Sequence, residues 1–126
     1  MNTKLELMYR DADNYKTYQT VILKGEISDL QIQTIKKNLI DDEFIVAEQV
    51  GLPTPSELFA KDFKFPTDSD HIYTVLVAFD DRTPNVESLL SEREATIELS
   101  INRFVEKISS VEWDELKEMD RLGIIQ

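Results

Sequence analysis

The chain opens with apolar residues at every second position. Leu5, Leu7 and Tyr9 alternate with more polar neighbours, and a period of two is typical of a strand with one buried face. Short polar residues at 11–14 favour a turn. The aromatic and β-branched segment 15–24 then predicts a second strand, so the two strands should pair as a hairpin.

The segment after this hairpin carries the signals of a helix start. Ser28 is a good N-cap, and Gln31 stands three residues later, where it can complete a capping box. Ile32, Ile35 and Leu39 would then lie on one face of the helix.

Two further strands are predicted in the middle of the chain. The segment 44–50 is apolar and β-branched, and it ends before Gly51 and Pro53, which predicts the third strand. The segment 71–80 is apolar on both of its faces, as expected of a central strand. Between them, the Thr-Pro-Ser-Glu sequence at 54–57 predicts a short helix with its own capping box.

Two helices are predicted in the last third. Ser91 and Glu94 are typical of a helix start, and apolar residues follow at helical spacing: Ile97, Ile101, Phe104, Val105 and Ile108. Ser110 would cap a final helix that bears Trp113, Leu116 and Leu122 and ends at Gly123. The predicted fold class is α+β: an antiparallel sheet of about four strands, helices packed on one face, and two C-terminal helices.

Composition narrows the class of protein. The 126 residues, 41% of them hydrophobic, are expected to form a single domain over 1–126. With 14 basic and 25 acidic residues the formal net charge is −11, which disfavours binding to duplex nucleic acid. No cysteine and one histidine exclude thiol nucleophiles and zinc-thiolate sites. No secretion signal or membrane-spanning run is visible, so we expect a cytoplasmic protein with no membrane partner, cofactor or metal.

The charge is uneven. Residues 1–40 carry six basic and five acidic groups, whereas 41–86 carry three and ten. An anionic ligand is therefore expected near the N-terminal third or beside basic residues of the last helices. Arg103 and Lys107, one helical turn apart, could hold a phosphate, or could instead pair with Glu106, with Glu98 or with solvent. The rings of Tyr15, Tyr73 and Phe79 could stack on a base or pack in the core.

Catalytic signals are weak. Asp68, Asp70 and His71 could bind a cation or act as acid and base, but a capped strand end with a half-buried histidine is the favoured interpretation of these residues. Clustered carboxylates such as Glu48, Asp80 and Asp81 leave a metal-dependent phosphoesterase as a residual alternative. No glycine-rich phosphate loop or nucleophile elbow is present in the sequence.

Four segments together resemble a known family. They are the sequence Tyr-Arg-Asp-Ala-Asp-Asn-Tyr-Lys at 9–16, the sequence Phe-Ile-Val-Ala-Glu-Gln-Val-Gly-Leu-Pro at 44–53, the pair Asp70-His71, and Asn-Arg-Phe-Val at 102–105. In this order they resemble small phage-encoded Thoeris anti-defence proteins. These are non-enzymatic sponges that capture cyclic ADP-ribose isomers made by a bacterial immune enzyme.

The resemblance implies an α+β protomer that assembles as a dimer, a hexamer or another symmetric oligomer, with nucleotide pockets at subunit contacts. Some members also hold cyclic oligonucleotides. Arg103 resembles the family's phosphate-contacting arginine. Gly51 stands where an arginine is expected beside the base, and Leu76 where an aromatic ring is expected. The candidate ligand-binding residues are Arg10, Tyr15, Gln49, Gly51, His71, Leu76, Phe79, Arg103 and Lys107.

The expected function is that of a non-enzymatic protein that sequesters a cyclic nucleotide signal and so blocks anti-phage defence, in the cytoplasm of an infected bacterium. An acidic interaction module that mimics DNA is the alternative, and the phosphoesterase comes third. Homo-oligomerisation is also predicted from apolar residues that one small sheet should not cover. These are Val86, Leu89, Leu90, Leu99, Trp113, Met119, Ile124 and Ile125.

Overall fold

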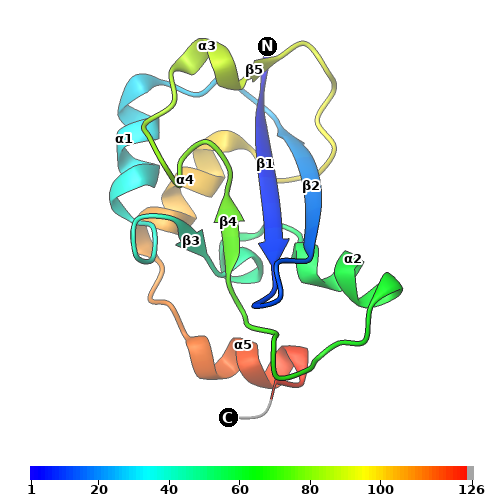
Figure 1. The fold of residues 1–126 in the computed structure, drawn as a ribbon. Coiled ribbons are helices and arrows are strands. Elements are labelled where there is room, and N and C mark those ends of the chain that lie inside the picture. Colours follow the sequence, from blue (N-terminus) through cyan, green and yellow to red (C-terminus); the bar gives the residue numbers. More distant parts are fainter. Residues whose placement is uncertain (125–126) are drawn as a thin grey trace.

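The computed structural model describes residues 1–124, and its first two strands form the predicted hairpin (Figure 1). β1 (Asn2–Arg10) pairs antiparallel with β2 (Lys16–Leu23) along its whole length. In the connecting turn, the carboxylate of Asp11 accepts the backbone N–H groups of Asp13 and Tyr15 at 3.0 and 2.9 Å. Local bonds from a short acidic side chain therefore fix the turn.

The sheet is antiparallel throughout and has the strand order β2-β1-β4-β3. β4 (Thr74–Leu76) lies between β1 and β3 (Phe44–Ile45), so the segment predicted to be central does lie inside the sheet. A short strand, β5 (Leu90–Ser91), also pairs with β1.

Helices surround this sheet. α1 (Asp29–Lys37) begins as predicted, with Ser28 and Gln31 forming a reciprocal capping box. The others are α2 (Pro55–Asp62), α3 (Val86–Leu89), α4 (Ile101–Ser110), α5 (Glu115–Leu122) and a 3-10 turn, η1 (Ala47–Val50). Together with the sheet they make the α+β class that was predicted, with two helices at the C-terminus.

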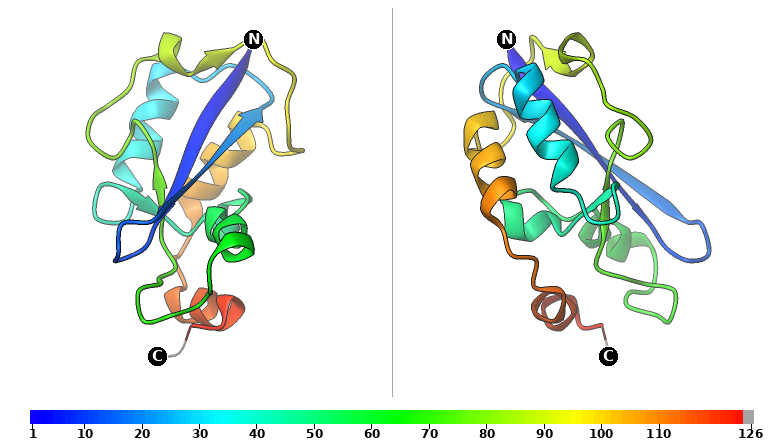
Figure 2. Two further views of the ribbon diagram at one scale, coloured as in Figure 1. Left: turned by 45° about the vertical axis from the view of Figure 1, so that its right-hand side comes forward. Right: turned by 90° about the vertical axis from the view of Figure 1, so that its left-hand side faces the viewer.

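The core lies between the sheet and the pair α1 and α4 (Figure 2). Leu5 and Leu7 of β1 point toward it, as the alternating pattern predicts. α1 contributes Ile32 and Ile35, and α4 contributes Phe104. Each of these side chains is at most 1% exposed.

Two predicted strands are much shorter than expected. The segment 44–50 leaves the sheet after Ile45 and continues as η1, and 71–80 pairs only over Thr74–Leu76. After β4 the chain turns, with Ala78 in the left-handed region at φ +75°. Both segments are buried for much of their length. A buried apolar run does not by itself specify a strand, because a compact turn satisfies the same pattern.

The helix predicted from Ser91 begins ten residues later. Segment 92–99 instead runs beside β2, where Thr96 and Ile22 exchange two hydrogen bonds of 2.9 Å. Since these bonds occupy backbone groups that a helix would use, tertiary pairing overrides the local signal. Ser100 caps α4 by accepting the N–H of Arg103.

The last helix also starts later than predicted, because Asp114 and not Ser110 is its cap. Gly123 ends it at φ +75°, as predicted. Leu116, predicted to belong to this helix, is 61% exposed, and the buried residue of α5 is Glu118. No helix within the described residues has the length and apolarity that a membrane span requires.

Candidate functional site

The predicted residues Arg10 and His71 meet at the end of β1. The Nε2 of His71 lies 2.7 Å from the backbone oxygen of Arg10, and its Nδ1 accepts the N–H of Tyr73 at 2.9 Å. Because Nδ1 accepts a backbone N–H, the ring proton is assigned to Nε2, which donates to the Arg10 carbonyl. Both nitrogens of the imidazole are therefore engaged in holding the backbone.

Asp70 is similarly engaged. One of its oxygens accepts the hydroxyl of Tyr9 at 2.5 Å, and the other accepts the backbone N–H of Thr67 at 2.8 Å. Burial, together with the hydrogen bond to Asp70, raises the pKa of the Tyr9 hydroxyl well above its ordinary value. The Asp70-His71 pair thus fastens the 67–73 segment to β1, which is the structural alternative considered for these residues.

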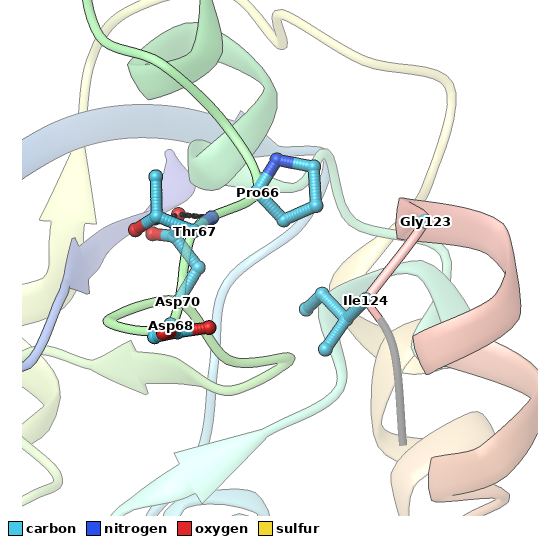
Figure 3. Close-up of a pocket in the computed structure, with 6 residues that line it drawn as sticks. All are labelled: Pro66, Thr67, Asp68, Asp70, Gly123 and Ile124. Carbon is cyan, nitrogen blue, oxygen red and sulfur yellow. Dashed lines mark hydrogen bonds between the residues drawn. The ribbon is translucent and has the colours of Figure 1, made fainter.

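The surface around this segment has several shallow hollows. One, of about 240 Å³, lies between Pro66, Thr67 and Asp68 on one side and Gly123 and Ile124 on the other (Figure 3). Another is lined by Arg10, Asn14 and His71. The polar groups here are largely used within the chain, since Asp70 is bonded to Thr67 in the close-up.

Tyr15 lies just beyond the hairpin turn and is 54% exposed. Its ring packs at 5.2 Å against Phe63, which stacks at 4.6 Å on the buried Phe59. The ring of Tyr15 is therefore accessible from solvent, and its stacking on a ligand stays a prediction. Phe63, which is 42% exposed, was missed because the segment after α2 shows no strand or helix periodicity.

Arg103 lies on the exposed side of α4. Its guanidinium is 3.0 Å from a carboxylate oxygen of Glu106, and the two side chains are 60% and 66% exposed. The pairing with Glu106, considered as an alternative to phosphate binding, is thus present. An ion pair between two exposed side chains contributes about 0–1 kcal/mol, so the guanidinium can exchange partners.

Gly51 lies beside Lys107. The glycine ends η1 at φ +84°, in the left-handed region, and a Cβ there would lie 3.4 Å from the methyl carbons of Leu99 and 3.5 Å from Cδ of Lys107. The structure therefore brings together two predicted residues 56 positions apart. We refer to Gly51, Arg103 and Lys107 as the α4 surface.

Gln49 is bonded at both ends of its side-chain amide. Its amide nitrogen donates to the backbone oxygen of Asp114 at 2.8 Å, and its amide oxygen accepts the N–H of the same residue at 3.0 Å. The side chain fastens η1 to the connection between α4 and α5. The side chain therefore has a structural role here, and its role in ligand binding stays a prediction.

Leu76 and Phe79 are not at a ligand surface. Both are fully buried, at 0% exposure, and belong to the hydrophobic core. The backbone turn between them is closed by the N–H of Phe79, which donates to the oxygen of Leu76 at 3.1 Å. The predicted ligand contacts at these positions are wrong, and the other reading of Phe79, as a core residue, is confirmed.

A buried ion pair was missed by the sequence analysis. Glu118 is 1% exposed, and its two carboxylate oxygens accept Nε and Nη2 of Arg121 at 2.5 and 2.9 Å. The same guanidinium reaches Glu57 at 2.6 Å and the hydroxyl of Thr54 at 3.0 Å. Thr54 and Glu57 therefore bind α5, whereas the sequence predicts a capping box for α2.

The apolar residues predicted to drive oligomerisation are better covered than expected. Leu89 is buried, and Val86, Leu99 and Trp113 pack against the core. Ile125 lies outside the described residues. The large hydrophobic side chains that are exposed belong to other positions: Met1, Tyr15, Tyr18, Leu30, Phe63 and Leu116.

Comparisons with protein families, with curated proteins and with solved structures gave no match. Among residues 1–124, no three histidine, aspartate or glutamate side chains gather in a group that could hold a metal ion.

Proposed function

We propose that this protein is a non-enzymatic binding protein that sequesters a cyclic nucleotide, such as a cyclic ADP-ribose isomer, and so blocks an anti-phage immune signal in the bacterial cytoplasm. The observation that carries the proposal is the α4 surface. There, Arg103 and Lys107 lie one helical turn apart on α4, and the stem of Lys107 lies beside the exposed Gly51. The resemblance to anti-defence sponges supplies the class of ligand.

The two cations suit a phosphate. The guanidinium of Arg103 can meet two phosphate oxygens, and its present partner, Glu106, is exposed and weakly held. The ammonium of Lys107 stands at the end of a stem that passes over Gly51. A phosphate bound by Arg103 would therefore have a second positive charge within reach.

The −11 net charge does not oppose such a site. Screening reduces the influence of exposed charges beyond about 8–10 Å at physiological ionic strength. Two cations in contact with a phosphate therefore outweigh carboxylates on distant parts of the surface. Within residues 1–124, the carboxylate paired with Arg103 is that of Glu106.

The state of the single histidine supports binding without chemistry. A general base needs a free nitrogen that reaches the reacting proton. Both nitrogens of His71 are occupied, and Asp70 beside it accepts bonds on both oxygens. Using either group as a base would first require the 67–73 segment to be released from β1.

The α4 surface favours an oligomer as the binding form. The five best-formed hollows lined by described residues do not include Arg103 or Lys107. A tight small-molecule site buries most of its ligand. A second subunit placed over the α4 surface would supply the missing walls, and the exposed Leu30 and Leu116 are available for such contacts.

The alternative, an acidic interaction module, is favoured by one observation. The carboxylates of Asp41 and Glu115, distant in sequence, both act on the hydroxyl of Tyr73. Glu115 is hydrogen-bonded to this hydroxyl, so at least one carboxylate stands beside the aromatic ring. A protein partner that binds at this ring while no nucleotide binds would support the alternative.

The proposal is tested by adding cyclic ADP-ribose isomers and cyclic trinucleotides to purified protein, followed by native mass spectrometry. We expect an oligomer with bound nucleotide, and a ligand that is chemically unchanged after denaturation. A 14.6 kDa monomer at micromolar concentration would contradict the subunit-contact pocket. A linearised product that disappears with a chelator would instead favour the phosphoesterase.

A further inference from the structure

A hollow lined by two basic side chains lies on the side of β1 opposite α1. Its volume is about 190 Å³, and it is formed by β1, the 77–84 segment and α3. The right-hand view of Figure 2 shows the segment after β4 looping away from the sheet on the side that α1 does not cover. We call it the β1–α3 hollow. It shares no residue with the α4 surface.

Two cations from separate elements line the β1–α3 hollow. Lys4 comes from the outer face of β1, and Arg82 comes from the connection between β4 and α3. Within the described part of the chain, neither side chain takes part in an ion pair. The lack of a carboxylate partner leaves both groups able to bind an external anion.

The remaining polar groups of the hollow are acceptors. Glu6 follows Lys4 on the same face of β1 and also lines the hollow. The hydroxyl of Ser88 donates to the backbone oxygen of Asn85 at 2.8 Å, so only its lone pairs remain free. The hollow thus offers two cationic donors and two acceptors to a ligand.

The floor of the hollow is apolar and fixed. Val77, Ala78 and Leu89 line it, and the N–H of Val77 donates to the backbone oxygen of Glu6 at 2.9 Å. Ala78 has φ +75°, a conformation that residues with a Cβ rarely adopt. Its methyl group is the smallest side chain, and this leaves the space above it open.

The size of the hollow limits the ligand. A water molecule takes about 30 Å³ of liquid, so 190 Å³ corresponds to about six waters. Sites for drug-sized molecules usually have about 300–1,000 Å³. A small charged group with a few polar atoms fits this space, whereas a dinucleotide does not.

We infer that the β1–α3 hollow binds a phosphomonoester that carries neighbouring hydroxyl groups, as a sugar phosphate does. The phosphate contacts Lys4 and Arg82, while the hydroxyls donate to Glu6 and Ser88. Inorganic phosphate is the poorer ligand, because its P–OH group cannot reach Glu6 and Ser88 together while the phosphate contacts Lys4 and Arg82, whereas the hydroxyls of a sugar extend beyond its phosphate. This inference does not depend on the proposed function, whose phosphate contact is Arg103.

The test is a calorimetric titration with ribose 5-phosphate, adenosine monophosphate and inorganic phosphate. Ribose 5-phosphate should bind more tightly than inorganic phosphate, and adenosine monophosphate should bind no more tightly than ribose 5-phosphate because its base stays outside. R82Q and K4Q should each weaken ribose 5-phosphate about tenfold, a typical loss for one charge-assisted contact. E6Q should reduce the preference over inorganic phosphate.

Two variants serve as controls. R93Q removes an exposed arginine outside the hollow and should bind ribose 5-phosphate as the wild type does. R103A should also leave ribose 5-phosphate binding unchanged, which separates this site from the proposed nucleotide site. Wild-type affinity in both R82Q and K4Q would overturn the inference, as would no binding of ribose 5-phosphate at millimolar concentration.

Discussion

Two arginines near the C-terminus each pair with a glutamate three positions away on the same helix, and they do so in opposite surroundings. Arg121 is 33% exposed, and its partner Glu118 is 1% exposed. Arg103 and Glu106 are 60% and 66% exposed. The same sequence spacing therefore gives one pair that joins two helices and another that lies in solvent.

The difference lies in what surrounds each glutamate. The carboxylate of Glu118 is buried away from water, and Arg121 is its ion-pair partner. A buried carboxylate without a partner is costly, so this guanidinium is committed to the fold. The carboxylate of Glu106 is exposed to water, so removing Arg103 changes the free energy of unfolding little. An arginine of the second kind can serve a ligand, whereas an arginine of the first kind cannot.

Phe79, which was predicted to contact a ligand, is also part of the structural core. Phe79→Ala should lower the free energy of unfolding by about 3–5 kcal/mol, because it removes a fully buried ring from the core. Urea denaturation measures this effect. A change below 1 kcal/mol would show that Phe79 is not packed in the core and would restore it as a ligand candidate.

Arg121→Ala should lower the free energy of unfolding by about 3 kcal/mol, since Glu118 would be left buried without its cation. The double variant Glu118→Leu with Arg121→Met replaces the pair by apolar side chains and should recover most of this loss. The comparison fails if the single variant is as stable as the wild type, or if the double variant is no more stable than Arg121→Ala.

The Tyr73 hydroxyl should make the stability of the protein depend on pH in the alkaline range. The hydrogen bond from Tyr73 to Glu115 raises the pKa of the Tyr73 hydroxyl to about 12, from an ordinary value of about 10. The folded state thus holds this proton more tightly than the unfolded state does. Its contribution is complete below pH 10 and is lost as the pH rises from 10 to 12.

Tyr73→Phe should therefore remove part of the loss of stability above pH 10, as measured by urea denaturation at several alkaline pH values. Tyr9→Phe is a useful comparison, because the pKa of Tyr9 is raised mainly by burial. An unchanged alkaline profile in Tyr73→Phe would mean that the bond to Glu115 does not persist in solution.

The smallest effect on stability is expected for Arg103→Ala. Since both members of its pair are exposed, the free energy of unfolding should change by no more than about 0.5 kcal/mol. Thermal denaturation beside Arg121→Ala gives the direct comparison. A large loss at Arg103 would place this guanidinium among the structural groups and remove it from the candidate site.

Local signals in the sequence predicted the hairpin, the capping box at Ser28 and the end of α5 at Gly123, because each depends on residues close in sequence. The late start of α4 could not be read in this way, since the bonds between Thr96 and Ile22 join segments 74 positions apart. The strands predicted at 44–50 and 71–80 are too long for the same reason, because the point at which each segment leaves the sheet depends on residues distant in sequence.

Only part of the candidate site could be predicted from the sequence, for a related reason. The one-turn spacing of Arg103 and Lys107 can be read from the sequence, but the approach of Gly51 to Lys107 depends on how η1 meets α4. Leu76 is buried at the end of β4, whereas Phe79 is buried in the turn that follows it, where the sequence predicts a continuing strand. The side chain of Gln49 is held by two hydrogen bonds to the backbone of Asp114, and no local sequence pattern indicates this contact.

The most direct test of this account is calorimetric titration of the wild type, Arg103→Ala, Arg103→Lys and Glu106→Gln with cyclic ADP-ribose isomers and cyclic trinucleotides. Arg103→Ala should weaken binding by about one to two decades, the usual loss for a charge-assisted contact in a partly buried site. Arg103→Lys should also weaken it, because an ammonium cannot form the two-pronged contact. Glu106→Gln frees the guanidinium and should bind at least as tightly as the wild type. Wild-type affinity in Arg103→Ala, for whichever nucleotide binds, would contradict the assignment.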